Sequence, residues 1–275
     1  MEDGAVNEQF FQVEGEGGAL RALLICPAGA LPQQEACLVF LHEGLGSIGQ
    51  WRDFPRELAR ATGHCALVFD RPGFGGSDPL QKPRDGRYLQ REDLGSVSAV
   101  LDGCQIASPI LIGHSDGGTL ALLYAAEFPG RPLGVIAEAA HVFVEELTLA
   151  GIRSAQRDYD AGALRKGLAR YHGGQTDAMF NRWVDDWLSP EFGQWSVEER
   201  LGAISCPVLV IQGEADPYGS PAQVESICRR VSGPSQSILI PGCGHVPHQQ
   251  AAGEVLEAMS RFIAGLRAPK GGAAL

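Results

Sequence analysis

Short, continuous apolar runs alternate with longer segments of helical periodicity along most of the chain. The runs do not alternate apolar with polar residues, which is typical of strands buried on both faces of a parallel sheet. Strands are predicted at 37–42, 65–70, 109–114, 133–137, 207–213 and 237–241. Helices are predicted at 51–61, 88–104, 116–127, 221–231 and 252–266. This order predicts an α/β fold with a mostly parallel, doubly wound sheet.

Two segments depart from this alternation. Residues 10–13 and 20–25 predict a short antiparallel hairpin at the start. Residues 143–200 have no strand pattern, are helix-like and hold three of the four tryptophans. We therefore expect a helical cap at 143–200, inserted between core strands, and a core made of 1–142 and 201–275. The tail at 268–275 is expected to be frayed.

The charge balance argues against two classes of partner. The chain has 275 residues and a formal net charge of -11, whereas a nucleic-acid binder normally carries a basic face. No run approaches the about 18 to 20 apolar residues of a membrane span, and the acidic start lacks the apolar part of a signal peptide. We expect a cytoplasmic protein with a small-molecule substrate and no nucleic-acid or membrane partner, with a homodimer left open.

The seven cysteines are odd in number and widely spaced, with no pair separated by two residues. This pattern is typical of reduced thiols used as small apolar residues, so neither a disulfide nor a zinc site is expected. No phosphate-binding loop or dinucleotide fingerprint occurs either. The sequence therefore predicts no metal and no cofactor.

The strongest chemical signal is the segment Gly113-His-Ser-Asp-Gly117, which lies between a predicted strand and a predicted helix. A nucleophilic serine on a sharp strand-to-helix turn requires this context and small flanking residues. Such a turn presents Ser115 at the carboxyl edge of the sheet, beside the positive end of a helix dipole. Ser115 is therefore predicted to be the nucleophile.

A serine hydroxyl needs a base, and the base needs a group that orients it. Along the chain the expected order is serine, acid, histidine, each just after a strand. Asp216 and His245 follow the strands at 207–213 and 237–241, so both are predicted at the same sheet edge as Ser115. Glu138 and Glu214 compete with Asp216 for the role of the acid, and His248 competes with His245 for the role of the base.

These motifs resemble those of the α/β-hydrolase superfamily, and in particular its capped branch of small esterases and proline-iminopeptidase-like enzymes. The resemblance covers about residues 20–267 and rests on five segments in family order: Leu41–Gly46, Phe69–Asp78, Gly113–Gly118, Gly213–Asp216 and Gly242–His245. It implies the α/β-hydrolase fold. It leaves the substrate open, because this fold hosts many chemistries.

The resemblance also implies an oxyanion hole of two backbone N–H groups. One belongs to Asp116, and the other to Gly44 or, second, Leu45. Glu43 stands where the family usually has glycine, so its carboxylate is expected to point away or to pair, with Arg71 or a cap arginine. The turn at 70–78 is expected to be scaffolding beneath the site.

Serine at position 115 favours acyl-enzyme chemistry, since an aspartate there would have suggested alkyl-enzyme chemistry. The expected substrate pocket includes Glu43, Phe143, Trp183 and Trp187. The two tryptophans, spaced i, i+4, are equally consistent with packing the cap onto the core.

The sequence thus predicts a serine hydrolase that acts on a small carboxylic ester or thioester. The alternatives are a hydrolase of carbon–carbon bonds beside a ketone (a meta-cleavage product hydrolase), a lactonase or an aminopeptidase using the same triad. A ligand-binding module that retains the triad is the alternative from another class.

Overall fold

The computed structural model describes residues 6–15, 17–32, 36–80 and 92–266. Within these ranges eight strands form one sheet in the order β1-β2-β4-β3-β5-β6-β7-β8. The strands are β1 (Val6–Gly15), β2 (Gly18–Pro27), β3 (Cys37–Leu41), β4 (Ala66–Phe69), β5 (Pro109–His114), β6 (Gly134–Glu138), β7 (Val208–Gly213) and β8 (Ser235–Ile240).

The sheet is parallel from β4 to β8 and antiparallel at its other end. β1 and β2 form the expected hairpin, but it is longer than predicted. It also joins the main sheet, because β2 pairs with β4 in antiparallel register, Ala22 opposite Phe69. The prediction of an α/β fold with a mostly parallel sheet is confirmed.

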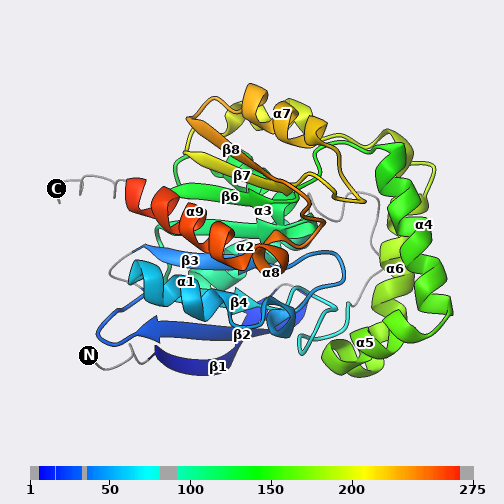
Figure 1. Cartoon of the computed structure of the whole chain (residues 1–275). Coiled ribbons are helices and arrows are strands. Elements are labelled where there is room, and N and C mark those ends of the chain that lie inside the picture. The colour runs from blue at the N-terminus through cyan, green and yellow to red at the C-terminus, as the bar shows by residue number, and fades with distance from the viewer. Residues whose placement is uncertain (1–5, 16, 33–35, 81–91, 267–275) are drawn as a thin grey trace.

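Helices cover both faces of the sheet (Figure 1). The alternation within a strand explains this: Leu38 and Phe40 pack in one apolar core with residues of α1 and α9, while Val39 and Leu41 pack in the other with α3. The α-helices are α1 (Phe54–Thr62), α2 (Glu92–Gly103), α3 (Asp116–Glu127), α4 (Glu146–Asp160), α5 (Ala163–His172), α6 (Thr176–Leu188), α7 (Pro221–Arg230), α8 (Pro247–Gln250) and α9 (Ala252–Gly265).

Most predicted elements agree with these bounds to within a few residues. The helix expected from residue 51 starts at Phe54, because residues 48–51 form a 3-10 turn and Pro55 lies in the first turn of the α-helix. The first residues of the helix predicted at 88–104 and the tail at 268–275 lie outside the described residues.

The segment between β6 and β7 is helical, with α4, α5 and α6 as its main elements. Its ends lie side by side, because Phe143 forms an isolated β-bridge with Ser196, and Val197 N–H donates to the carbonyl of Val142 at 2.8 Å. These three helices lie beyond the ends of the strands, on the right in Figure 1. This is the segment for which the sequence predicts a cap.

The prediction that no cysteine forms a disulfide is wrong. Cys26 and Cys65 are bonded, 39 positions apart. They meet because β2 runs antiparallel to β4 with Ile25 opposite Ala66, which places the next residue of β2 opposite the residue before β4. Sequence spacing does not reveal this pairing, since it depends on how the hairpin joins the sheet. The expectation of a cytoplasmic protein therefore loses the support of uniformly reduced thiols.

In the described part of the chain, no helix combines the length and apolar character needed to cross a membrane. The same residues contain no group of three or more His, Cys, Asp or Glu side chains that could hold a metal ion.

Candidate active site

Ser115 occupies the turn between β5, which ends at His114, and α3, which begins at Asp116. Its backbone has φ +54° and ψ -118°, a conformation that is costly for a residue with a side chain. The turn is held by the Ser115 N–H, which donates to the carbonyl of Glu138 at 2.8 Å. The strand-turn-helix context expected around Ser115 is therefore present.

The small residues around this turn are required by close backbone contacts. A Cβ on Gly113 would lie 2.0 Å from the carbonyl oxygen of Gly117, and a Cβ on Gly117 would lie 1.9 Å from that of Leu41. Larger residues at either position would push α3 away from β3 and β5. The glycine spacing thus fixes where the Ser115 hydroxyl lies.

His245 connects Ser115 to Asp216. The Ser115 hydroxyl lies 3.0 Å from Nε2 of His245, and Nδ1 of the same ring lies 2.9 Å from each carboxylate oxygen of Asp216. All three residues follow the carboxyl ends of parallel strands, which explains why a loop of β7 and a loop of β8 meet the turn of β5. The structure thus brings the three predicted residues into one hydrogen-bonded chain.

The Asp216 carboxylate is buried but well supported. Burial raises its pKa, but the hydrogen bond and charge of His245 and the backbone N–H of Tyr218 outweigh this and leave the pKa lowered. Tyr218 N–H donates at 2.8 Å, and the Gln212 amide donates at 3.3 Å. The acid therefore stays ionised and can hold an imidazole that gains a proton.

Of the residues that compete for the roles of acid and base, Glu138 and His248 are bonded to each other and Glu214 is exposed. Nδ1 of His248 donates to Glu138 at 2.9 Å, and the His248 backbone N–H donates to the same carboxylate at 2.6 Å. Among the described residues, the side chains of these three form no hydrogen bond with the Ser115 hydroxyl, which faces His245.

The loop after β3 approaches the nucleophile at Gly44. A Cβ there would lie 2.3 Å from Nε1 of Trp183 and 2.8 Å from a carboxylate oxygen of Asp116, so only glycine fits. Gly44, Leu45, Asp116 and Ser115 line the same cavity. The residues expected to supply the oxyanion hole therefore line one cavity together with the serine.

Glu43 pairs, but not with an arginine. Its carboxylate accepts from Nδ1 of His114 at 3.4 Å and from the Gln50 amide at 3.2 Å. Arg71 instead donates to the backbone carbonyl of Glu43 at 2.8 Å. Although desolvation raises the pKa of Glu43, the hydrogen bond and charge of His114 lower it to about 2. The expected pairing with Arg71 or a cap arginine is thus wrong, because the carboxylate turns toward β5.

The turn after β4 is scaffolding, as expected. The Asp70 carboxylate accepts from the backbone N–H of Ile48 at 2.7 Å and of Gly76 at 2.8 Å. The Ser77 hydroxyl donates to the Asp70 carbonyl at 2.6 Å. These bonds fix the loop after β3 against the turn at 70–78.

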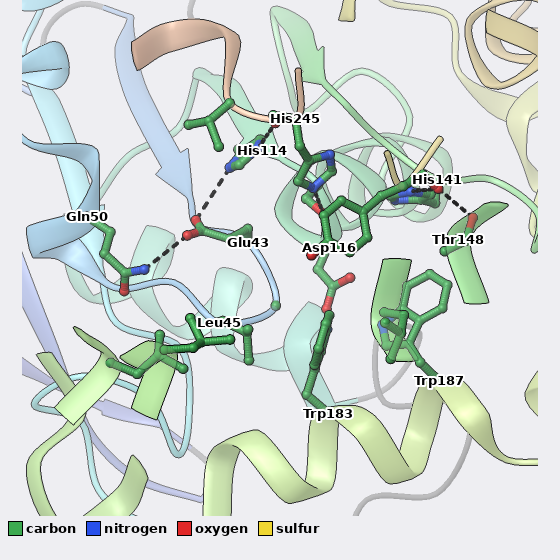
Figure 2. A pocket seen from close by; sticks show the side chains of 17 residues that line it. Glu43, Leu45, Gln50, His114, Asp116, His141, Thr148, Trp183, Trp187 and His245 are labelled. Carbon is green, nitrogen blue, oxygen red and sulfur yellow. Dashed lines mark hydrogen bonds and ion pairs between the residues drawn. The ribbon is translucent and has the colours of Figure 1, made fainter. Parts of the chain in front are cut away.

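Ser115 lines a cavity of about 240 Å³, in which Glu43 and Gln50 lie on one side of Asp116 and His141 and Trp187 on the other (Figure 2). The helical segment between β6 and β7 supplies much of its wall through Thr148, Ile152, Leu164, Leu168, Trp183 and Trp187. The two tryptophans are also buried against neighbouring side chains, so they both line the cavity and pack.

Phe143 was expected in the pocket, but it is not among the residues that line it. Its place in the β-bridge with Ser196 puts it at the base of the helical segment, where the chain leaves the core. Trp195 also lies outside the lining and stacks on Phe192 with ring centroids 5.0 Å apart.

Two histidines that the sequence analysis did not single out also border the site. His114 precedes Ser115, and its Nε2 donates to the backbone carbonyl of His245 at 2.7 Å. His141 donates from Nε2 to the carbonyl of Tyr218 at 3.1 Å, and burial lowers its pKa to about 4. The sequence could have indicated a role for His114 through its position, one residue before the nucleophile at the end of a predicted strand.

The chain is similar to known hydrolases. The family model described as "Alpha/beta hydrolase family" matches residues 38–258. Serine hydrolase BPHL of Mus musculus is 26% identical over 208 residues, covering 72% of this chain and 68% of that protein. The 2-hydroxy-6-oxo-6-phenylhexa-2,4-dienoate hydrolase of Burkholderia cepacia is 25% identical over 241 residues, covering 77% and 82%.

Among solved structures, the 2-hydroxy-6-oxo-6-phenylhexa-2,4-dienoate hydrolase of a Rhodococcus species superposes with a TM-score of 0.75 at 15% identity, covering 94% of this chain and 99% of that one. A sequence identity of 15% supports a shared fold and no shared activity. The expected superfamily is confirmed.

Proposed function

This chain belongs to the alpha/beta hydrolase family, and we propose that it is a serine hydrolase of small carboxylic esters or thioesters. One observation carries the proposal: Ser115, His245 and Asp216 form a continuous hydrogen-bonded chain, of which Ser115 and His245 line a cavity. Family membership supports a hydrolase. The arrangement of the three side chains supports acyl transfer through the serine.

In the proposed reaction, Nε2 of His245 takes the proton of the Ser115 hydroxyl as its oxygen attacks the substrate carbonyl. The ionised Asp216 holds Nδ1–H and stabilises the imidazolium that forms. His245 then returns the proton to the leaving alcohol or thiol. Water, activated by the same imidazole, releases the acid from Ser115.

The tetrahedral oxyanion is assigned to the backbone N–H groups of Asp116 and Gly44, with Leu45 as the second choice on the loop. Asp116 is the first residue of α3, so its N–H lies among those that the helix itself leaves without an intrahelical acceptor. Donors fixed in advance in this way are worth about 3 to 4 kcal/mol each in the transition state.

The cavity favours a short, largely apolar acyl group. Its volume of about 240 Å³ is small, and the helical segment contributes aliphatic and indole side chains to the wall. We propose that this segment, residues 143–200, is a cap that shields the oxyanion from water and sets acyl size.

The charge of the wall does not separate the alternatives. The lining includes Glu43 and Asp116, and no lysine or arginine among the described residues lines it. It also includes His114, whose ring lies 3.4 Å from the Glu43 carboxylate, so the wall carries groups of both signs. A carbon–carbon hydrolase is the second candidate, because the Burkholderia cepacia relative is named as a hydrolase of a dienoate. A lactonase and an aminopeptidase that use the same triad follow it.

A panel of p-nitrophenyl esters of increasing chain length, with an amino-acid p-nitroanilide and a dienoic keto-acid, tests the proposal. We expect multiple turnovers on short esters that Ser115→Ala abolishes. Turnover of the anilide alone would move the assignment to an aminopeptidase. Tight binding without turnover would indicate a ligand-binding module.

A further inference from the structure

His114 contacts both loops that flank the nucleophile. Its Nδ1 faces the Glu43 carboxylate on the loop after β3, at 3.4 Å. Its Nε2 faces the backbone carbonyl of His245 on the loop after β8, at 2.7 Å (Figure 2). The ring itself is buried at the end of β5, directly before Ser115. One imidazole thus joins the loop of Gly44, the nucleophile and the loop of His245.

Both acceptors require a proton on the nitrogen that faces them, so the geometry favours the imidazolium form. Burial lowers the pKa of His114, but the hydrogen bond of Glu43 and the charges of Glu138 and Glu43 raise it to about 9. At neutral pH the ring therefore donates two hydrogen bonds at once, each strengthened by its charge.

The Glu43 side chain is fixed on its own loop as well. A Cβ on Gly46 would lie 2.4 Å from the carboxylate oxygen that faces His114, so the glycine leaves space for it. The Glu43 carbonyl accepts from Gly46 N–H at 3.0 Å and from the Arg71 side chain at 2.8 Å. The carboxylate is thus presented to β5 by a loop that has little freedom to move.

Backbone contacts hold the His245 loop on either side of that residue, and Nδ1 of the ring is bonded to Asp216. Gly244 N–H donates to the Gln250 side chain at 2.6 Å, and Ala215 N–H donates to the carbonyl of Cys243 at 2.8 Å. At His245 itself, the backbone carbonyl is bonded to His114. The distance from Nε2 to the Ser115 hydroxyl therefore depends on this backbone contact as well as on the bond of Nδ1 to Asp216.

We propose that Glu43 and His114 are positioning residues that hold the His245 backbone, and so keep its imidazole in line with Ser115. The inference rests on the proposed serine-hydrolase function. Neither residue takes part in proton transfer: Glu43 orients the His114 ring, and the ring fixes the carbonyl of the residue that does. A displacement of about 1 Å in such a site costs about 100-fold in rate.

Three substitutions of Glu43 test this in the full chain. Glu43→Ala removes the acceptor of His114. Glu43→Gln supplies an amide that donates to Nδ1 of a neutral ring, while Nε2–H still donates to His245. Glu43→Asp keeps the charge but withdraws the carboxylate by one methylene.

Glu198→Ala is the matched control. The side chain of Glu198 is 24% exposed against 23% for Glu43, and it too forms an ion pair, with Arg230 at 3.0 Å. It is not among the residues that line the cavity. Its removal lowers stability by a comparable mechanism and leaves the proposed positioning contact untouched.

We expect Glu43→Ala to lower kcat on a p-nitrophenyl ester about 10- to 100-fold with little change in KM. The rate at which a fluorophosphonate labels Ser115 should fall in parallel. Glu43→Gln should recover most of the loss, and Glu198→Ala should keep the wild-type kcat whatever its melting temperature. If Glu43→Ala does not fold, Glu43→Asp should show the lowered kcat instead.

Wild-type kcat in folded Glu43→Ala or Glu43→Asp would overturn the positioning role while leaving the proposed function intact. So would a loss of kcat in Glu43→Gln as large as that in Glu43→Ala, because the rescue is specific to the ring's second hydrogen bond. If the wild-type protein neither turns over the ester panel nor takes up the label at Ser115, the proposed function fails, and the positioning role fails with it.

Discussion

Glu138 and His248 are bonded to each other, with Nδ1 of His248 2.9 Å from the Glu138 carboxylate. Glu138 is the last residue of β6 and His248 lies in α8, and by sequence position each is a rival for the acid or the base. Burial raises the pKa of Glu138, but the charge and hydrogen bonds of His248 outweigh it and leave the pKa lowered. The contact therefore gives these two residues a shared structural role and leaves Ser115 to His245.

Substituting the two acids should separate these roles. Asp216→Asn should cost about 10,000-fold in kcat, because the asparagine amide holds the imidazole in the wrong tautomer. Glu138→Gln should retain turnover and lower the free energy of unfolding by about 1 to 3 kcal/mol, since it weakens a buried hydrogen-bonded contact. Steady-state kinetics and denaturant unfolding check both. A dead Glu138→Gln with an active Asp216→Asn would mean that the acid is on β6.

The base and the acid should act as a unit. His245→Ala and the double variant with Asp216→Asn should have nearly the same residual kcat, because triad members are not additive. An active His245→Ala with a dead His248→Ala would place the base three residues further on.

The tryptophans of the helical segment should separate into two kinds. Trp183 lies beside Gly44 in the cavity wall. Trp183→Ala should change the ratio of kcat/KM between longer and shorter esters about tenfold, since one methylene in an apolar pocket is worth about 1 to 3 kcal/mol. Trp195→Ala should leave the preference unchanged and lower the free energy of unfolding by about 3 to 5 kcal/mol, because Trp195 packs on Phe192 outside the lining. The chain-length profile and thermal unfolding of each variant check this.

Trp187 lines the cavity and also packs on Trp195, so Trp187→Ala should show both effects. If all three variants keep the wild-type profile, the helical segment does not set specificity.

The Glu43–His114 pair should make stability depend on pH. The pKa of His114 is raised to about 9 in the folded chain, against about 6.5 for a free imidazole. The stabilisation is complete below about pH 6.5 and is lost as the pH rises through 9, because only the folded chain holds the proton between these values. The melting temperature of wild type should therefore exceed that of Glu43→Ala most at pH 6, and the gap should narrow toward pH 10. A gap that stays constant over this range would contradict the pairing.

Reduction should destabilise the fold. Closing a loop across 39 positions by the Cys26–Cys65 bond stabilises a chain by about 4 kcal/mol in the loop-entropy model. Dithiothreitol or the Cys26→Ser variant should lower the melting temperature, and thiol counting under denaturing, non-reducing conditions should find five free cysteines. Seven free thiols with an unchanged melting temperature would show that the bond does not form.

The parallel sheet and the grouping of Ser115, Asp216 and His245 could be predicted from the sequence because both depend on local signals. Continuous apolar runs mark buried strands, and Ser115, Asp216 and His245 each follow such a run closely. The glycines at 113 and 117 mark a turn that tolerates nothing larger.

The features that could not be predicted from the sequence depend on how segments distant along the chain meet in the fold. The Cys26–Cys65 bond follows from the antiparallel join of β2 to β4, and the partner of Glu43 follows from its side chain turning toward β5 instead of toward Arg71. Phe143 lies outside the cavity lining because the helical segment closes on itself at Ser196, which places this residue at the base of the segment.

The central claim is that Ser115 carries the acyl group, and trapping that residue tests it most directly. The protein is treated with a fluorophosphonate, digested and analysed by mass spectrometry, with Ser115→Ala treated in parallel. The account predicts one adduct, on the peptide that contains Ser115, formed in step with the loss of ester hydrolysis and absent from the variant. An adduct on Ser47 or Ser77 in its place, or full ester hydrolysis by Ser115→Ala, would contradict it.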